Sequence, residues 1–348
     1  MPAAVAGAAA YPPAFPLPHL DFSSARELPD SYAWPATDDT PSIDADRDSA
    51  PPVIDLAAPD AAEQAGRAAR TWGAFQIVNH GVPARLLAET EAAGKRLFAL
   101  PPDRKLLAAR SPDGISGYGL ARISHFFSKL MWSEGFTIVG SPAEHARRLW
   151  PHDYAPFCEV TEAYAEAMYP LAGKLMWLLL GPLGITRDDI KWAGPETDFH
   201  GAKAALQMNS YPTCPDPDRA MGLAAHTDSN LLTILHQNGT SGLQLLREGS
   251  GWVTVPPLAG ALVVNVGDLL HILTNGHYTA VLHRALVNRT DHRLSFAYLY
   301  GPPDGVPISP LSKLVSPSRK PLYRAVTWAE YLDAKARHFN EALSTIRL

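Results

Sequence analysis

The sequence has few cysteines, no excess of positive charge and no long apolar run. Two cysteines in 348 residues cannot make a disulfide framework, which favours a reducing compartment. A net charge of −5 argues against nucleic acid or an anionic membrane as the main partner. The longest apolar run, residues 175–180, is far shorter than the roughly 20 residues that span a bilayer. We therefore expect a cytoplasmic protein that binds neither membranes nor nucleic acid.

Composition and periodicity divide the chain into four parts. Residues 1–50 are rich in Ala, Pro, Asp and Ser, and we expect them to be poorly ordered. Residues 51–200 carry helix and strand patterns that should pack on a core formed by residues 201–305. Residues 306–348 should form a helical extension, because Thr327 begins a capping-box sequence.

Helix and strand patterns alternate before the core. The strands are expected at 51–56 and 74–79, and the helices at 60–70, 83–100 and 154–180. Pro170 should kink or split the last helix, because proline lacks the backbone N–H that the helix needs. His80 follows the second strand, and we expect it to stabilise a turn rather than to bind a ligand.

Eight short strand patterns with turn signals between them form the expected core. They lie at 206–211, 222–227, 231–237, 242–247, 251–255, 261–266, 280–288 and 293–300. Short strands without long helices between them are typical of a jelly roll, whose mouth can hold a ligand. The fold class is therefore mixed α/β and mainly β: a double-stranded β-helix (jelly-roll) core flanked by N-terminal and C-terminal helices.

The core contains a histidine and a carboxylate two residues apart, His226 and Asp228. Side chains two residues apart on a strand point the same way. With His283 they would form the two-His, one-carboxylate set of non-haem Fe(II) oxygenases, which leaves coordination positions open. Spacing alone does not single out His283, because four other histidines lie nearby: His236, His271, His277 and His292.

A second pair with the same spacing, Arg293 and Ser295, lies on the last expected strand. A guanidinium offers paired donors with a permanent charge, and it suits the distal carboxylate of a small diacid. His292 would face away from Arg293 on an extended strand, which weakens it as a rival ligand.

Several motifs resemble those of plant 2-oxoglutarate- and Fe(II)-dependent dioxygenases over nearly the whole chain. They lie at 52–56, 72–81, 209–212, 226–228, 266–268, 283–284 and 293–295. Within that family the chain is most similar to the gibberellin 3-oxidases. The stretches that carry this closer resemblance are 126–137, 149–151, 224–229, 265–276 and 297–303. The resemblance implies that His283, rather than a neighbouring histidine, completes the metal site.

The resemblance also implies an activity. The metal ligands and catalytic residues would be His226, Asp228 and His283, and the residues that bind 2-oxoglutarate would be Arg293, Ser295, Tyr211 and Asn209. Fe(II) would be the cofactor, 2-oxoglutarate and O2 the co-substrates, and ascorbate the reductant. A ferryl-oxo intermediate would hydroxylate a C19 gibberellin at the 3β position and release succinate and CO2. No obligatory protein partner is implied.

Alignment with these relatives implies a substrate pocket. Its residues would be Phe136, Ile138, Gln207, Leu299, Tyr118, Phe127 and Lys129. A rigid terpenoid needs apolar walls and a cation or hydroxyl for its carboxylate. Either Lys129 or Arg122 could supply the cation.

Three other functions remain compatible with these residues. A gibberellin 2-oxidase or a related plant dioxygenase would share every metal and co-substrate residue. A catalytically silent gibberellin-binding module would need neither the metal set nor Arg293 and Ser295. A zinc hydrolase could use the His/Asp set, but it would leave Arg293 and Ser295 unexplained.

Overall fold

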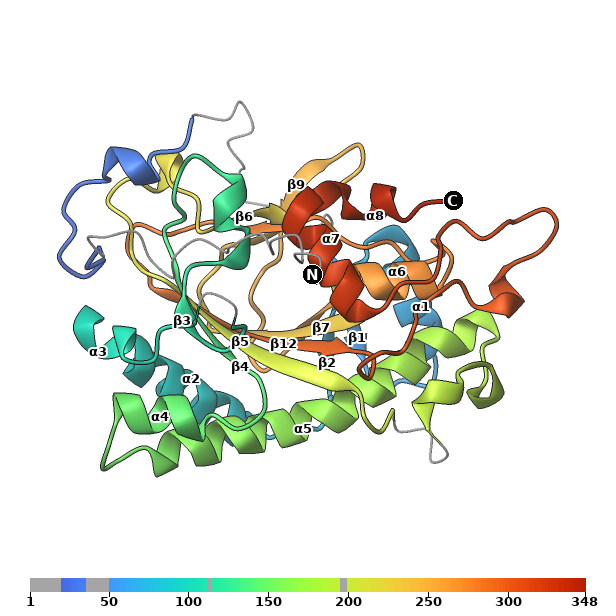
Figure 1. Cartoon of the computed structure of the whole chain (residues 1–348), viewed down its shortest axis with the longest axis horizontal. Helices are drawn as coiled ribbons and strands as arrows, with labels where there is room; N and C mark the ends of the chain where they lie inside the picture. The colour runs from blue at the N-terminus through green and yellow to red at the C-terminus, as the bar shows by residue number, and fades with distance from the viewer. Residues whose placement is uncertain (1–19, 36–49, 112–113, 195–198) are drawn as a thin grey trace, which may run out of the picture.

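The computed structural model describes residues 20–35, 50–111, 114–194 and 199–348. These residues form a mixed α/β fold with two sheets (Figure 1). A cavity lies between the sheets and is lined by residues of both. The mixed class expected from the sequence is confirmed. Residues 1–19 and 36–49, which make up most of the segment expected to be poorly ordered, lie outside the described residues.

The larger sheet has eight strands, antiparallel except for its first pair. Their order is β1 (Val53–Asp55), β2 (Ala74–Val78), β10 (Leu262–Val266), β7 (Leu232–Gln237), β12 (Arg293–Gly301), β5 (Lys203–Tyr211), β4 (Glu134–Ile138) and β3 (Gly117–Gly119). Strands β5 and β12 pair over their full length and form the middle of the sheet. This pairing places chain segments some ninety residues apart side by side.

The smaller sheet has four antiparallel strands. Their order is β6 (Leu223–His226), β11 (His283–Ala285), β8 (Leu243–Arg247) and β9 (Gly251–Thr254). All eight strands expected in the core are therefore present, as β5 to β12. The strand expected at 280–288 is much shorter, because only residues 283–285 pair with β6 and β8.

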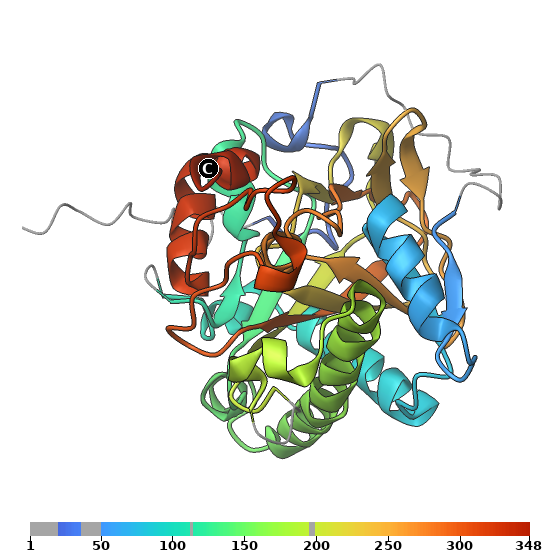
Figure 2. The same cartoon turned by 90° about the vertical axis from the view of Figure 1, so that its right-hand side faces the viewer.

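Long helices cover the outer face of the larger sheet. They are α1 (Ala61–Thr71), α2 (Ala84–Phe98) and α5 (Ala155–Leu180), and Figure 2 shows α5 below the sheet on the side away from the smaller sheet. The expectation that Pro170 splits α5 is wrong, because the helix runs unbroken for 26 residues. Met168, Leu171 and Ala172 are buried on either side of the proline, so packing offsets the lost backbone hydrogen bond.

The remaining helices complete the described chain. The α-helices are α3 (Pro102–Leu106), α4 (Ala143–Leu149), α6 (Asp268–Leu273), α7 (Trp328–His338) and α8 (Ala342–Thr345). The 3-10 turns are η1 (Asp30–Tyr32), η3 (Arg122–Phe126), η4 (Gly181–Leu183), η5 (Arg187–Asp189), η6 (Lys191–Ala193), η7 (Pro217–Arg219), η8 (Ser312–Leu314) and η9 (Phe339–Glu341). The capping box is confirmed, since Thr327 and Glu330 exchange side-chain and backbone hydrogen bonds. No helix in the described ranges is long and apolar enough to cross a membrane.

Residues 20–35 pack on the body of the protein, in contrast to the disorder expected for the first fifty residues. Phe22 and Tyr32 are buried, and their rings meet Trp132 edge-on at centroid distances of 4.9 Å and 5.5 Å. The Trp34 indole N–H donates to the Leu130 carbonyl at 2.9 Å. Composition missed these contacts because a few aromatic side chains are enough to hold a polar segment in place.

A buried ion pair holds the edge of the larger sheet beside the cavity. Lys105 Nζ of α3 lies 2.5 Å from Glu134 Oε1 of β4, and both side chains are at least 94% buried. The Tyr118 hydroxyl of β3 donates to the same carboxylate oxygen. Burial raises the pKa of Tyr118 and Glu134 raises it further, so the phenol stays protonated as a donor.

Replacing Lys105 by Met should strongly destabilise the protein. The variant leaves the Glu134 carboxylate buried without its cation, which costs about 3–5 kcal/mol of unfolding free energy. Arg85→Met is the matched control, because Arg85 pairs with Glu89 in solvent, where such pairs contribute little to stability. Urea unfolding followed by circular dichroism measures both. Equal midpoints for the two variants would refute the prediction.

Candidate metal centre

Two adjacent strands of the smaller sheet bring His226 and His283 together. His226 ends β6, His283 begins β11, and the two residues are direct cross-strand partners with ring centroids 4.3 Å apart. Asp228 lies two residues beyond His226, just past the end of the strand. Its Oδ1 is 3.7 Å from Nε2 of each histidine. One ligand atom from each residue lies within 4.8 Å of the other two, a spacing that suits a single metal ion.

In both imidazoles, Nδ1 points away from the cluster and toward a backbone carbonyl. His226 Nδ1 lies 2.9 Å from the Ala224 carbonyl and His283 Nδ1 lies 3.1 Å from the Val281 carbonyl. A carbonyl accepts only from an N–H, so in the neutral form of each ring the lone pair is on Nε2, which is directed at the cluster. Burial and the neighbouring His283 lower the pKa of His226 to about 3, so this ring is neutral at ordinary pH. Neutral imidazole is the form that binds metals.

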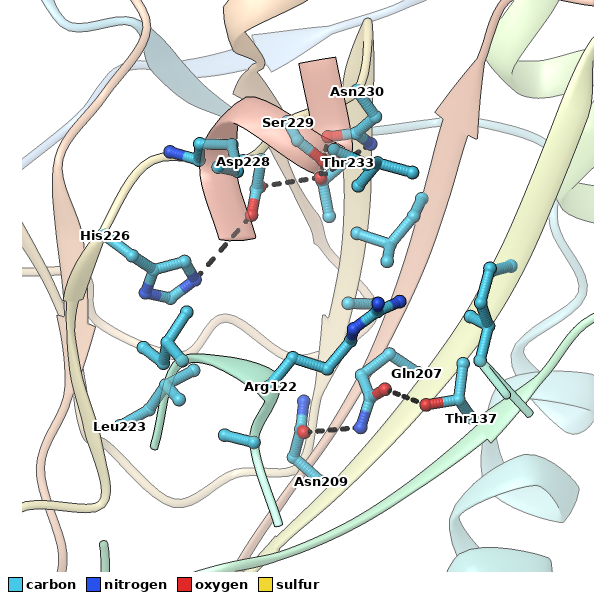
Figure 3. A pocket seen from close by; sticks show the side chains of 18 of the residues that line it. Arg122, Thr137, Gln207, Asn209, Leu223, His226, Asp228, Ser229, Asn230 and Thr233 are labelled. Atoms are coloured by element: carbon cyan, nitrogen blue, oxygen red, sulfur yellow. Dashed lines mark hydrogen bonds and ion pairs between the residues drawn. The ribbon is translucent and has the colours of Figure 1, made fainter. Parts of the chain in front are cut away.

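Asp228 supplies the negative charge of the cluster. Burial opposes its ionisation, but the two histidines and a hydrogen bond from Thr233 together hold the pKa of Asp228 below its ordinary value. The Thr233 hydroxyl on β7 donates to Oδ2 at 2.6 Å and leaves Oδ1 facing the histidines (Figure 3). Two imidazoles and one carboxylate on one side of a site are the donor set that suits non-haem Fe(II).

Three of the four competing histidines have other partners. His236 Nε2 is 3.2 Å from Glu91, and His292 Nε2 is 2.9 Å from the Ser210 hydroxyl. His271 contacts the Tyr278 carbonyl and the Tyr323 hydroxyl. His80 stabilises a turn as expected, through the Gly260 carbonyl and the Val82 N–H. Among the described residues, the groups able to hold a metal converge only at His226, Asp228 and His283.

Arg293 and Ser295 lie on the larger sheet and face the cluster of three candidate metal ligands, His226, Asp228 and His283, which is called the metal cluster below. On β12 they lie opposite Tyr211 and Asn209 of β5, so all four side chains share one face. Arg293 is 1% exposed, and its Nη2 donates to Gln237 at 2.9 Å. Its Nε and Nη1 make no hydrogen bond to any part of the chain that the structure describes. Burial lowers the pKa of Arg293 while Tyr211 opposes this shift, and a buried cation with unused donors suits an anionic ligand.

One cavity of about 710 Å³ contains both groups of residues, within the size range of small-molecule sites. Apolar side chains line much of its wall: Ile115, Leu120, Ile123, Phe126, Val139, Leu299, Trp328 and Leu332. Its basic side chains are Arg110, Arg122, Lys203, Arg284, Arg293 and Lys335, against two carboxylates, Asp228 and Asp304. Six cations and two anions make the cavity basic in a protein of net charge −5. An apolar ligand that carries negative charge fits this lining.

The structure brings only some of the expected substrate contacts to this cavity. Gln207 and Leu299 line it. The other five, Phe136, Ile138, Tyr118, Phe127 and Lys129, are not among its lining residues. Alternation along β4 explains two of these errors, since Thr137 faces the cavity while Phe136 and Ile138 point to the opposite, buried face. Lys129 instead donates to the Asp30 carbonyl at 2.7 Å.

Other cavity residues went unrecognised in the sequence. Thr137 pairs in register with Gln207 and donates to its side chain (Figure 3). Phe126 lines the wall in place of its neighbour Phe127, and Lys335 enters from the C-terminal helix. Thr137 is the cross-strand partner of Gln207, so the two side chains lie on the same face of the sheet. The sequence alone could not identify Thr137, because only the structure gives the register of β4 on β5.

Family models match two parts of the chain. Residues 202–302 match the 2OG-Fe(II) oxygenase superfamily, and these residues hold the metal cluster, Arg293 and Ser295. Residues 51–154 match the family described as non-haem dioxygenase in morphine synthesis N-terminal.

Curated proteins and solved structures agree with these matches. Gibberellin 3-beta-dioxygenase 1 of Pisum sativum is 60% identical over 95% of this chain and 90% of that protein, and its Arabidopsis thaliana namesake is 59% identical over 95% and 94%. The crystal structure of JOX2 in complex with 2OG, Fe and JA is 30% identical, has a TM-score of 0.78 and covers 95% of this chain and 98% of that one. A rice dioxygenase for auxin oxidation is 29% identical at a TM-score of 0.70, covering 85% and 99%. The chain belongs to the 2OG-Fe(II) oxygenase superfamily and, within it, to the gibberellin 3-beta-dioxygenases.

Proposed function

We propose that this protein catalyses the 2-oxoglutarate- and Fe(II)-dependent 3β-hydroxylation of a C19 gibberellin. The convergence of His226, Asp228 and His283 in one cavity with Arg293 carries the proposal, and identity of about 60% to a gibberellin 3-beta-dioxygenase supports the substrate. Residues 201–305 act as the catalytic core, with β5 to β12 as its double-stranded β-helix.

In this proposal His226, Asp228 and His283 hold Fe(II). The Ala224 and Val281 carbonyls keep both imidazoles in the tautomer that presents Nε2 to the metal. Three protein ligands on one side leave positions for the co-substrates. When bound, Fe(II) supplies the redox chemistry that couples oxidative decarboxylation of 2-oxoglutarate to hydroxylation of a C–H bond.

Arg293 and Ser295 bind the distal carboxylate of 2-oxoglutarate in this proposal. The unused Nε and Nη1 of Arg293 supply charged donors, and the Ser295 hydroxyl lies two residues away on the same strand face. Tyr211 and Asn209, directly opposite on β5, orient the co-substrate. The chain thus fixes one end of 2-oxoglutarate on the larger sheet, while the metal cluster on the smaller sheet meets its other end.

Arg122 is the cation that we assign to the gibberellin carboxylate. It lines the cavity and extends into it from η3, between the metal cluster and Gln207 (Figure 3). Lys129, the other cation that the sequence offers for this carboxylate, is not a cavity residue and donates to the Asp30 carbonyl at 2.7 Å. The apolar wall formed by residues such as Leu299 and Trp328 holds the ring system.

Product analysis tests the proposal directly. Purified protein receives Fe(II), 2-oxoglutarate, ascorbate and a C19 gibberellin that lacks the 3-hydroxyl, and the products are identified by mass spectrometry. We expect a 3β-hydroxylated product and a matching amount of succinate. A 2β-hydroxylated product would refute the proposed regiochemistry and favour a gibberellin 2-oxidase. Absence of any 2-oxoglutarate consumption by the iron-loaded protein would favour a silent binding module.

Replacing Arg293 by Ala should weaken the binding of 2-oxoglutarate and leave metal binding intact. Hydrogen bonds to charged groups contribute about 1.5–3 kcal/mol, so KM for 2-oxoglutarate should rise about 10-fold to 150-fold. Arg289→Ala is the control, because Arg289 is exposed and donates to the Pro215 carbonyl outside the cavity. Steady-state kinetics and metal analysis are the measurements. An unchanged KM in the Arg293 variant would exclude this role.

Replacing Arg122 by Gln should raise KM for the gibberellin by about 10-fold or more, since it removes a charged donor to the carboxylate. The methyl ester of the same gibberellin should distinguish the variant from wild type. Wild type should prefer the free acid, and the variant should turn over acid and ester with similar KM. Lys129→Met is the control and should keep the preference of wild type, because Lys129 is not a cavity residue. A variant that still prefers the acid would contradict the assignment.

A further inference from the structure

The C-terminal helix α7 forms one wall of the cavity. The side chains of Trp328, Ala329, Leu332, Lys335 and Ala336 line it, which is the spacing of one helix face. Figure 2 shows this helix on the opposite side of the larger sheet from α5. Beyond its end, the Asn340 side chain donates to the Ala225 carbonyl of β6 at 3.1 Å. The 3-10 turn η9 that follows α7 therefore contacts the strand that carries His226.

A buried ion pair joins α7 to the first residue of α6. Lys335 Nζ lies 3.1 Å from Asp268 Oδ2, and the side chains are 13% and 0% exposed. The Tyr331 hydroxyl, also on α7, donates to the same oxygen at 2.8 Å. A buried pair of this kind adds little net stability on its own, because desolvation offsets the attraction between its charges. The ion pair lies beside Thr227, however, which suggests that it positions this residue.

The ion pair acts on the residue between two of the proposed metal ligands. Lys335 Nζ donates to Thr227 Oγ1 at 2.7 Å, and Thr227 Oγ1 donates to Asp268 Oδ2 at 3.0 Å. The backbone N–H of Asp268 donates to the Asp228 carbonyl at 2.8 Å. Thr227 follows His226 and precedes Asp228, so these contacts hold the turn on which both ligands depend.

We propose that Lys335 and Asp268 are positioning residues for the metal centre. They hold Thr227 and the Asp228 carbonyl, and thereby fix the angle at which His226 and Asp228 meet a metal. A change that displaces α7 should therefore also lower the affinity of the site for a metal. The inference rests on the metal ligands assigned in the proposed function.

Metal affinity tests this link without turnover. Mn(II), which accepts the same nitrogen and oxygen ligands as Fe(II), is titrated into the metal-free full-length protein and followed by electron paramagnetic resonance. Outer contacts of metal ligands are worth about 10-fold to 100-fold in affinity, so Lys335→Met should weaken Mn(II) binding about 10-fold or more. Arg337→Met should bind as wild type, because on the same helix Arg337 pairs with Asp333 in solvent.

A double variant separates positioning from stability. Lys335→Met alone leaves Asp268 buried without its cation and should lower the melting temperature. Lys335→Met with Asp268→Asn removes both charges, so it should recover stability and still bind Mn(II) weakly. Wild-type Mn(II) affinity in the folded double variant overturns the inference, and it does so even if the single variant fails to fold. Wild-type protein that binds no Mn(II) overturns the proposed metal site itself.

Discussion

The active site depends on the register between β6 and β11. His226 and His283 are cross-strand partners, whereas Leu223 pairs with Ala285, so three steps along β6 match two along β11. The extra residue in β6 lies between Leu223 and His226, and a bulge of this kind re-aims the side chains beside it. A slip of one residue would turn one imidazole to the opposite face of the sheet. The two imidazoles could then no longer meet at one metal ion.

In the proposed site, the two sheets divide the binding of ligands between them. The smaller sheet supplies the histidines, and the larger sheet supplies Arg293. Thr233 connects these two halves, because it lies on β7 of the larger sheet and its hydroxyl orients Asp228. The distance between a metal and the guanidinium is consequently set by packing of the whole sandwich. A large packed core is needed because it holds these few polar side chains at a fixed distance from one another.

The sequence predicted those features that depend on local periodicity. The eight core strands, the capping box at Thr327 and the pairs of polar residues two apart all follow from alternation or from short-range hydrogen bonds. The substrate wall could not be predicted in this way. Phe136 and Thr137 are neighbours on β4, and which of them faces the cavity depends on the pairing of β4 with β5. Helix α5 shows the same limit, because burial on both sides of Pro170 overrides the local signal.

The proposed positioning of the metal ligands depends on contacts between distant parts of the chain, which no local sequence pattern predicts. Lys335 reads as an ordinary solvated charge on an amphipathic helix, yet its ammonium bonds Thr227 across 108 positions of the chain. Asp268 reads as part of a Gly-Asp turn, yet it begins α6 and is fully buried. Each residue is costly to bury alone, and each is tolerated because the other is present. The pair fixes α7, which lines the cavity, against the start of α6, and the backbone N–H of Asp268 in turn holds the carbonyl of Asp228, a proposed metal ligand.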